Sequence, residues 1–194
     1  MSKERRLAIF ASGAGSNARN LLTYFSNHEW IRCVGIYSNR SDAGVLDTAK
    51  AFQVPIMVLT RHDFANPSGL MQHMANLGVT DIVLAGFLWR IPAALVEAFP
   101  HRIYNIHPSL LPKYGGKGMY GHFVHEAVFA AQEAVSGITI HYVNEHYDEG
   151  AVIAQFETDC KDAHSAQEIE MRVRALEGAH FPKVIEKILL ESRD

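Results

Sequence analysis

The sequence has few of the features that mark secreted, membrane or nucleic-acid-binding proteins. Two cysteines, Cys33 and Cys160, are too few for a disulfide framework and fit a reducing compartment. Eighteen lysines and arginines stand against 21 aspartates and glutamates, so the formal net charge of −3 lacks the basic excess of a nucleic-acid binder. The longest apolar stretch, residues 82–89, is too short to cross a bilayer. We therefore expect a cytoplasmic protein with no membrane or nucleic-acid partner.

The amino terminus also lacks a secretion signal. Its charged start is followed by an apolar run at residues 7–11, which is too short for a signal-peptide core. The remaining composition, 48% hydrophobic and 20% charged, is that of a globular protein. No linker, repeat or low-complexity segment divides the chain. We expect a single domain over residues 1–194 with a substantial core.

Short β-branched runs alternate with amphipathic runs through residue 107 and predict the fold class. The alternation favours an α/β, Rossmann-like open sheet whose amino-terminal part is parallel, with helices on both faces. Strands are expected at residues 6–11, 31–37, 55–59, 81–85 and 102–106. Helices are expected at residues 17–25, 45–52, 70–77 and 122–131.

Towards the carboxyl end the apolar residues alternate with a period of two. Residues 138–143 and 152–156 flank a turn and predict two antiparallel strands. The last helix is expected to open on a capping box from Ser165 to Glu168 and to kink at Pro182.

A glycine-rich turn, residues 12–17, joins the first strand to the first helix. Backbone N–H groups at a helix N-terminus bind anions, so the turn predicts a phosphate site at Gly15, Ser16 and Asn17. A turn without a ligand is the alternative. The spacing also fits a dinucleotide fingerprint, but the second strand leads into Ser-Asn-Arg at residues 38–40, with no carboxylate for a ribose. NAD is therefore disfavoured, and the arginine leaves NADP open.

Asn105 and His107 are the strongest catalytic candidates. Residues two apart on a strand point to the same side, and this strand ends where open α/β sheets bind ligands. An amide that stabilises an oxyanion, beside an imidazole that transfers protons, suits attack on a carbonyl. Ser109 lies in no nucleophile-elbow motif, which favours direct transfer between two bound substrates. The alternative is a histidine bonded to a loop carbonyl.

Asp148 lies in the turn between the two carboxyl-terminal strands. Loops at this edge of the sheet bring a carboxylate within reach of His107, where it would raise the histidine pKa and orient the ring. An ordinary turn residue is the alternative.

Four motifs in order carry a resemblance to a known family. They are Gly-Ser-Asn at residues 15–17, Ala-Gly-Phe at 85–87, Asn-Ile-His-Pro-Ser-Leu-Leu-Pro at 105–112, and Asp148-x-Gly150. With these separations, the chain resembles the glycinamide ribonucleotide formyltransferase family over almost its whole length. The resemblance implies transfer of a formyl group from 10-formyltetrahydrofolate to the amine of glycinamide ribonucleotide in purine (IMP) biosynthesis.

The resemblance also implies the role of each residue. Asn105 and His107 would stabilise the tetrahedral intermediate, with Asp148 raising the pKa of His107. Gly15, Ser16, Asn17 and Glu177 would hold the ribonucleotide, and the folate would contact Leu88, Trp89, Arg90, Ile91, Asn105, Val143 and Asn144. No metal is implied, and a monomer or a homodimer is expected. Residues 1–100 would then form the phosphate-binding half and residues 101–194 the catalytic and folate-binding half.

Three departures from the family pattern affect the expected folate and loop contacts. Arg90 is displaced by one position, and Pro67 stands where the family often has an arginine, so recognition of the folate glutamate tail is left open. Residues 114–121 are longer and richer in glycine than usual, and Lys117 within them is able to reach an anion. His125 keeps a family position without an assigned role.

Two other classes of protein are weighed against the transferase. A metal-dependent hydrolase would use His107, His141 and Asp148, although no common metal-ligand spacing is present. A non-catalytic nucleotide-binding module would use only the first half and leaves the later motifs unexplained. Methionyl-tRNA formyltransferase and formyltetrahydrofolate hydrolase share the expected fold but carry further domains.

Overall fold

The computed structural model describes residues 4–191 and contains one seven-stranded sheet. Its order is β3-β2-β1-β4-β5-β6-β7. The strands are β1 Arg5–Phe10, β2 Ile31–Ser38, β3 Ile56–Val58, β4 Asp81–Leu84, β5 Ile103–His107, β6 Val135–Tyr142 and β7 Val152–Asp159. Pairs among β1 to β5 are parallel, whereas β5–β6 and β6–β7 are antiparallel. The predicted fold class is confirmed.

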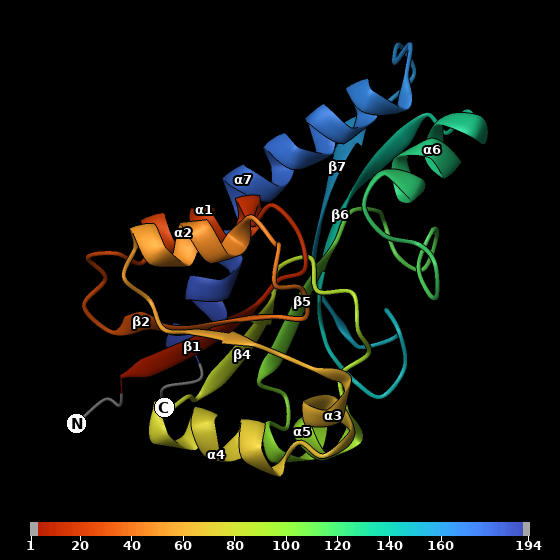
Figure 1. The fold of residues 1–194 in the computed structure, drawn as a ribbon. Coiled ribbons are helices and arrows are strands. Elements are labelled where there is room, and N and C mark those ends of the chain that lie inside the picture. The colour runs from red at the N-terminus through yellow and green to blue at the C-terminus, as the bar shows by residue number, and fades with distance from the viewer. Residues whose placement is uncertain (1–3, 192–194) are drawn as a thin grey trace.

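Helices cover both faces of the sheet (Figure 1). One face carries α1 Ser16–Tyr24, α2 Val45–Ala51, α6 His122–Ala130 and α7 Ala166–Glu191, and the other carries α3 Arg61–Ala65, α4 Ser68–Asn76 and α5 Ala93–Ala98. The sequence pattern did not predict α3 and α5, because helices of five and six residues are too short to show a helical period.

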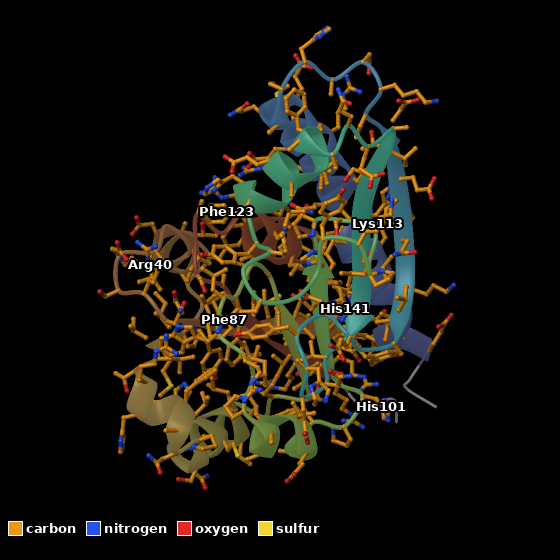
Figure 2. The ribbon with its side chains drawn as sticks, turned by 90° about the vertical axis from the view of Figure 1, so that its right-hand side faces the viewer. Arg40, Phe87, His101, Lys113, Phe123 and His141 are labelled. Carbon is orange, nitrogen blue, oxygen red and sulfur yellow. The ribbon has the colours of Figure 1, made fainter. Side chains whose placement is uncertain are left out.

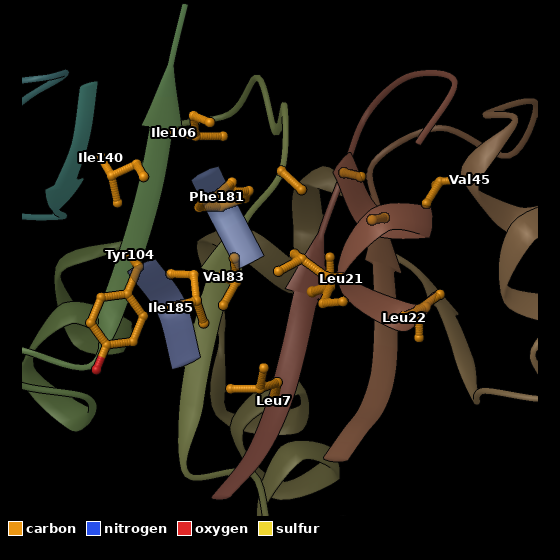
Figure 3. Close-up of a cluster of buried hydrophobic side chains, with 14 of the residues drawn as sticks. Leu7, Leu21, Leu22, Val45, Val83, Tyr104, Ile106, Ile140, Phe181 and Ile185 are labelled. Carbon is orange, nitrogen blue, oxygen red and sulfur yellow. The ribbon is translucent and has the colours of Figure 1, made fainter. Parts of the chain in front are cut away.

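The two cores follow from the alternation of side chains along β1. Leu7 and Ile9 point to the α1/α7 face, and Ala8 and Phe10 point to the α4/α5 face. All four side chains are fully buried, which is typical of a central parallel strand. Figure 3 shows Phe181 of α7 beside these strands on the first face. The sheet is thereby held between helices on both sides.

Helix α7 runs through Pro182 without ending. Proline has no N–H to give to the carbonyl four residues earlier, which here belongs to Gly178. Asn20 of α1 donates its side-chain amide to that carbonyl at 3.1 Å. The expected capping box is half formed: Glu168 N–H donates to Ser165 Oγ, but the Glu168 carboxylate accepts from His164 rather than from Ser165. No helix within residues 4–191 combines the length and apolarity needed to cross a membrane.

Candidate active site

A cavity of about 640 Å³ opens at the carboxyl ends of the central strands. Its wall is formed by the turn after β1, the segment after β4, the end of β5, the loop before α6, the turn before β7 and one side of α7. The volume lies within the range of small-molecule sites, and the location is the one at which open α/β sheets bind ligands. The cavity is therefore the candidate active site.

Asn105 and His107 reach this cavity together from the end of β5, as their spacing predicts. Asn105 lies opposite His141 in the antiparallel β5–β6 pair. His141 Nδ1 donates to the Tyr142 carbonyl at 2.8 Å, so its Nε2 is left as the acceptor. The Asn105 amide donates to that Nε2 at 3.0 Å and lies 3.5 Å from Asp148 Oδ1. His141 thus fixes which way the Asn105 amide faces.

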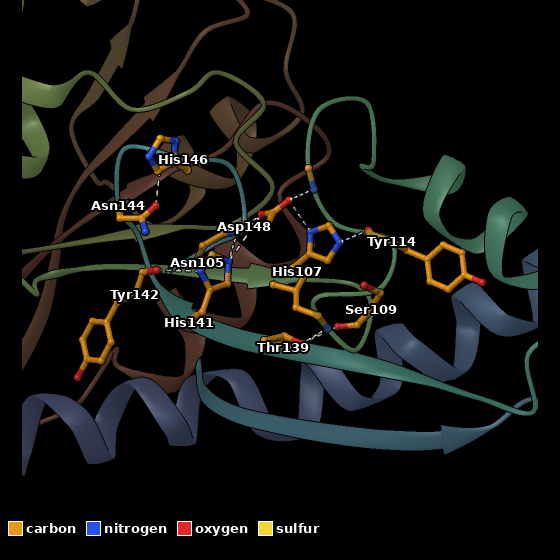
Figure 4. A network of polar contacts seen from close by, with 12 residues as sticks. Asn105, His107, Ser109, Tyr114, Thr139, His141, Tyr142, Asn144, His146 and Asp148 are labelled. Carbon is orange, nitrogen blue, oxygen red and sulfur yellow. Dashed lines mark hydrogen bonds and ion pairs between the residues drawn. The ribbon is translucent and has the colours of Figure 1, made fainter. Parts of the chain in front are cut away.

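His107 contacts both the loop before α6 and Asp148 (Figure 4). Its Nε2 donates to the Tyr114 carbonyl at 2.7 Å, and its Nδ1 lies 3.5 Å from Asp148 Oδ2. The sequence left open whether His107 is catalytic or only bonded to a loop carbonyl. The structure has the bond to the loop carbonyl and, in addition, the contact with the Asp148 carboxylate. We call Asn105, His107 and Asp148 the transfer end of the cavity.

Two opposing influences act on the pKa of His107. Burial lowers it below its ordinary value of 6.5, and the Asp148 carboxylate is the largest opposing influence. The predicted influence of Asp148, which raises the pKa of His107, is therefore present, but burial makes the net shift downward. The His107 side chain is only 5% exposed, so the loss of water around the ring outweighs the effect of one carboxylate 3.5 Å away.

Asp148 is held in a strained backbone conformation. Its φ is 57°, in the left-handed region, and Gly116 N–H donates to its Oδ2 at 2.9 Å. Burial raises its pKa, but the neighbouring His141 and His107 rings and the Gly116 N–H favour the carboxylate and leave the pKa below its ordinary value. Gly150 follows it because a Cβ there would collide with the Tyr142 carbonyl. The sequence motif Asp148-x-Gly150 thus has a backbone explanation.

The predicted phosphate residues line the opposite part of the same cavity. Gly15 has φ 80° immediately before α1, and a Cβ there would lie 2.7 Å from the Val45 Cβ. Asn17 donates its side-chain amide to Glu177 Oε2 at 2.9 Å, which joins α1 to α7. Burial raises the pKa of Glu177, and the Asn17 hydrogen bond opposes the rise. We call Gly15, Ser16, Asn17 and Glu177 the phosphate end.

Of the predicted folate residues, some line the cavity and others do not. Leu88 and Asn105 line the cavity; the remainder, Trp89, Arg90, Ile91, Val143 and Asn144, are absent from its wall within the described chain. Ile91 is buried in the α4/α5 core, and Trp89 packs against Phe64 with the Arg61 guanidinium 4.0 Å above its ring. Val143 N–H is already used by the Ile103 carbonyl.

Several residues of the cavity wall were not predicted from the sequence. Glu170 and Arg174 lie on α7 two turns and one turn before Glu177, respectively, and form an ion pair at 2.5 Å. Their spacing of four and then three residues places them on the same helix side as Glu177, a signal present in the sequence. Arg40, which the sequence suggested only as a candidate contact for NADP, also lines the cavity. It lies at the edge of the molecule in Figure 2, where it pairs with Asp42 at 2.8 Å.

The metal-hydrolase alternative lacks a site in the part of the chain that the structure describes. No group of three or more His, Cys, Asp or Glu side chains within residues 4–191 is arranged to hold a metal ion. His107 and His141 do flank Asp148, but each donates one ring nitrogen to a backbone carbonyl. The neighbouring His125 is buried against the same wall, and burial lowers its pKa.

Comparisons with known proteins identify the same family that the motifs resemble. The formyl transferase family model matches residues 5–185. The chain belongs to this family. It is 37% identical to the chloroplastic phosphoribosylglycinamide formyltransferase of Arabidopsis thaliana over 97% of this chain, and it covers 67% of that longer relative. It is 32% identical to the phosphoribosylglycinamide formyltransferase of Bacillus subtilis, over 95% of both chains.

Solved structures show the same relationship. The phosphoribosylglycinamide formyltransferase of Anaplasma phagocytophilum superposes with a TM-score of 0.87 at 29% identity, covering 97% of this chain and 88% of that one. The enzyme of the same name from Brucella melitensis gives 0.86 at 30% identity, covering 96% of both. Family and fold are therefore shown over nearly the whole chain.

Proposed function

We propose that the transfer end moves the formyl group of 10-formyltetrahydrofolate to the amine of glycinamide ribonucleotide. The chain is a phosphoribosylglycinamide formyltransferase by family, and purine biosynthesis is the setting of that activity. The observation that carries the proposal is the convergence of Asn105, His107 and Asp148 on one cavity whose far wall is the N-terminus of α1.

The chemistry is a direct displacement. The glycinamide amine forms a bond to the formyl carbon, and the carbonyl oxygen becomes an oxyanion. One Asn105 N–H is engaged with His141, and the other faces Asp148 over the longer distance of 3.5 Å. A substrate oxygen would replace this weaker contact and accept the second N–H. Donors preorganised in this way stabilise a developing oxyanion.

His107 supplies the proton transfer through Nδ1. Its Nε2–H is engaged by the Tyr114 carbonyl, so Nδ1 is the nitrogen free to take or give a proton. The ring takes the proton that the attacking amine loses. The oxyanion then returns to a carbonyl as the C–N bond to the folate breaks, and the imidazolium gives the same proton to the leaving folate nitrogen. Burial keeps His107 neutral at rest, and the oxyanion together with Asp148 would stabilise the imidazolium as it forms.

The phosphate end would hold the ribonucleotide. The first turn of α1 offers backbone N–H groups and the positive end of the helix dipole to the phosphate. Glu177, already accepting from Asn17, has carboxylate oxygens suited to ribose hydroxyls. Lys117 and Arg174 line the cavity and add positive charge near it. A chain of net charge −3 would thus bind two anionic substrates through a local surface.

The folate contacts and the setting are also proposals. Leu88 and Asn105 would contact the folate ring, whereas Trp89, Arg90, Ile91, Val143 and Asn144 would need a shift of the adjoining segments to do so. We place the activity in the cytoplasm, since both cysteines are free thiols. One domain with a complete cavity in each chain suits a monomer or a homodimer, and sedimentation would distinguish them.

The test is an absorbance assay of tetrahydrofolate release with 10-formyltetrahydrofolate and glycinamide ribonucleotide. We expect turnover with the ribonucleotide, and much slower turnover with glycinamide, which lacks the ribose phosphate. Release of tetrahydrofolate at the same rate without any acceptor would identify a hydrolase instead. No turnover by a correctly folded chain would overturn the proposal.

A further inference from the structure

We propose that the loop before α6, residues 114–121, is a positioning element of the transfer end. Its backbone holds the His107 imidazole and the Asp148 carboxylate in their working orientation. The inference rests on the proposed function for its catalytic consequence, although the contacts are those of the protein without substrate. It assigns a purpose to the one segment whose glycine content sets this sequence apart from the expected pattern.

Two backbone groups of the loop bind the two titratable groups directly. The Tyr114 carbonyl accepts from His107 Nε2 at 2.7 Å, and Gly116 N–H donates to Asp148 Oδ2 at 2.9 Å. The groups so held face each other, with 3.5 Å between His107 Nδ1 and the same Asp148 oxygen. The first bond selects the Nε2–H tautomer of His107 and so directs Nδ1 to the carboxylate. The loop therefore sets both the tautomer and the separation of the pair (Figure 4).

The start of the loop is itself anchored. Tyr114 has a left-handed φ of 56°, which aims its carbonyl at His107 while its hydroxyl donates to Glu133 at 2.9 Å. Lys113 pairs with the same carboxylate at 2.8 Å. Strained residues persist only where their surroundings determine them, and they cluster at functional sites. Tyr114 and Asp148 both carry this strain, on the two sides of His107.

Close packing against neighbouring side chains explains why residue 115 is a glycine. A Cβ at Gly115 would lie 2.5 Å from the Leu111 side chain and 3.4 Å from the Cβ of Asp148. The loop thus passes directly against Asp148, which brings the Gly116 N–H within reach of the carboxylate.

Gly116 and Gly118 offer a matched pair for an experiment. Their φ values are 91° and 93°, and a Cβ would meet nothing within 4 Å at either position. Alanine therefore strains both sites alike and crowds neither. Only Gly116 donates to Asp148; no hydrogen bond within residues 4–191 joins Gly118 to Asp148 or His107.

The deciding measurement is the titration of Asp148 by carboxyl NMR in the chain without substrate, with the resonance assigned from Asp148→Asn. Gly116→Ala is expected to raise the pKa of Asp148, because relaxation of its φ moves the N–H away, and Gly118→Ala is expected to leave it unchanged. Imidazole nitrogen shifts are expected to show the Nε2–H tautomer of His107 in the wild type. If either alanine variant does not fold, an ester at residue 116 or 118 removes the N–H without adding a side chain.

Activity supplies the second readout. Loss of one hydrogen bond to a carboxylate predicts a kcat about tenfold lower for Gly116→Ala than for Gly118→Ala, with similar KM for the ribonucleotide. An Asp148 pKa that is the same in the wild type and in both residue-116 variants would overturn the inference. So would equal losses of kcat at 116 and 118. A wild type without transfer activity would refute the proposed function, while the NMR titration would still decide the role of the loop.

Discussion

The two ends of the cavity are built in different ways. At the phosphate end, a left-handed glycine and a helix N-terminus present backbone N–H groups, and burial raises the pKa of the neighbouring Glu177. At the transfer end, three side chains from one strand and a strained turn are held by one another, by His141 of β6 and by loop backbone. The first arrangement suits binding, and the second suits proton transfer and charge stabilisation. Substitutions at the two ends should therefore divide between KM and kcat.

The largest effect is expected from His107→Ala. Because we propose that His107 transfers the proton, its removal predicts a fall in kcat of about a thousandfold, with the KM for glycinamide ribonucleotide nearly unchanged. Steady-state rates of tetrahydrofolate release provide the measurement. His62→Ala, at an exposed position on α3, is the control. A comparably large rise in the KM for the ribonucleotide would mean that the two ends are not separate in function.

Asp148→Asn should have the next largest effect. Loss of the carboxylate removes the main influence that raises the pKa of His107, so this pKa falls further below 6.5. Less imidazolium then forms at neutral pH, and we predict a kcat about a hundredfold lower. NMR titration of His107 checks the direction of the shift, with the exposed Asp47→Asn as the control. A His107 pKa that rises in Asp148→Asn would contradict this account.

Asn17→Ala tests the phosphate end. It removes the amide that donates to Glu177 and weakens the link between α1 and α7. We predict a KM for the ribonucleotide about tenfold higher, as expected for one hydrogen bond to a charged group, and an unchanged kcat. Glycinamide without its ribose phosphate is the control substrate and should show no such difference between variant and wild type.

The smallest expected effect is on the pH dependence of stability. Burial lowers the pKa of His107 and of His125, so below 6.5 the unfolded chain binds protons at these residues more readily than the folded one. Their contribution to the unfolding free energy is therefore lost as the pH falls, at most about 1.4 kcal/mol per pH unit for each histidine. Urea unfolding of His125→Gln should show a shallower decline between pH 6.5 and 5.5 than the wild type. Parallel curves would contradict the assignment.

The same comparison shows what the sequence is able to predict. The phosphate end depends on neighbours in the chain, since Gly15, Ser16 and Asn17 act where a strand turns into a helix. The spacing of Asn105 and His107 on β5 is local in the same sense. Strand and helix periods together with local turn chemistry are therefore sufficient to predict the sheet, its longer helices and most residues at each end of the cavity.

The rest depends on contacts between distant segments. His141 orients Asn105 only because β6 pairs antiparallel with β5 in one register. The direction of the His107 pKa shift depends on burial, and burial cannot be read from a sequence motif. Ile91 follows a motif and yet turns into the α4/α5 core, away from the cavity. Long-range register and burial are thus the features that the sequence pattern leaves undetermined.

The central claim is that His107 performs the transfer and leaves binding to the other end. Its most direct test is a single-turnover experiment on His107→Ala saturated with both substrates, with ribonucleotide binding confirmed by calorimetry. The account predicts binding equal to the wild type and formyl transfer slower by about a thousandfold. Transfer at the wild-type rate by the fully bound variant would contradict it.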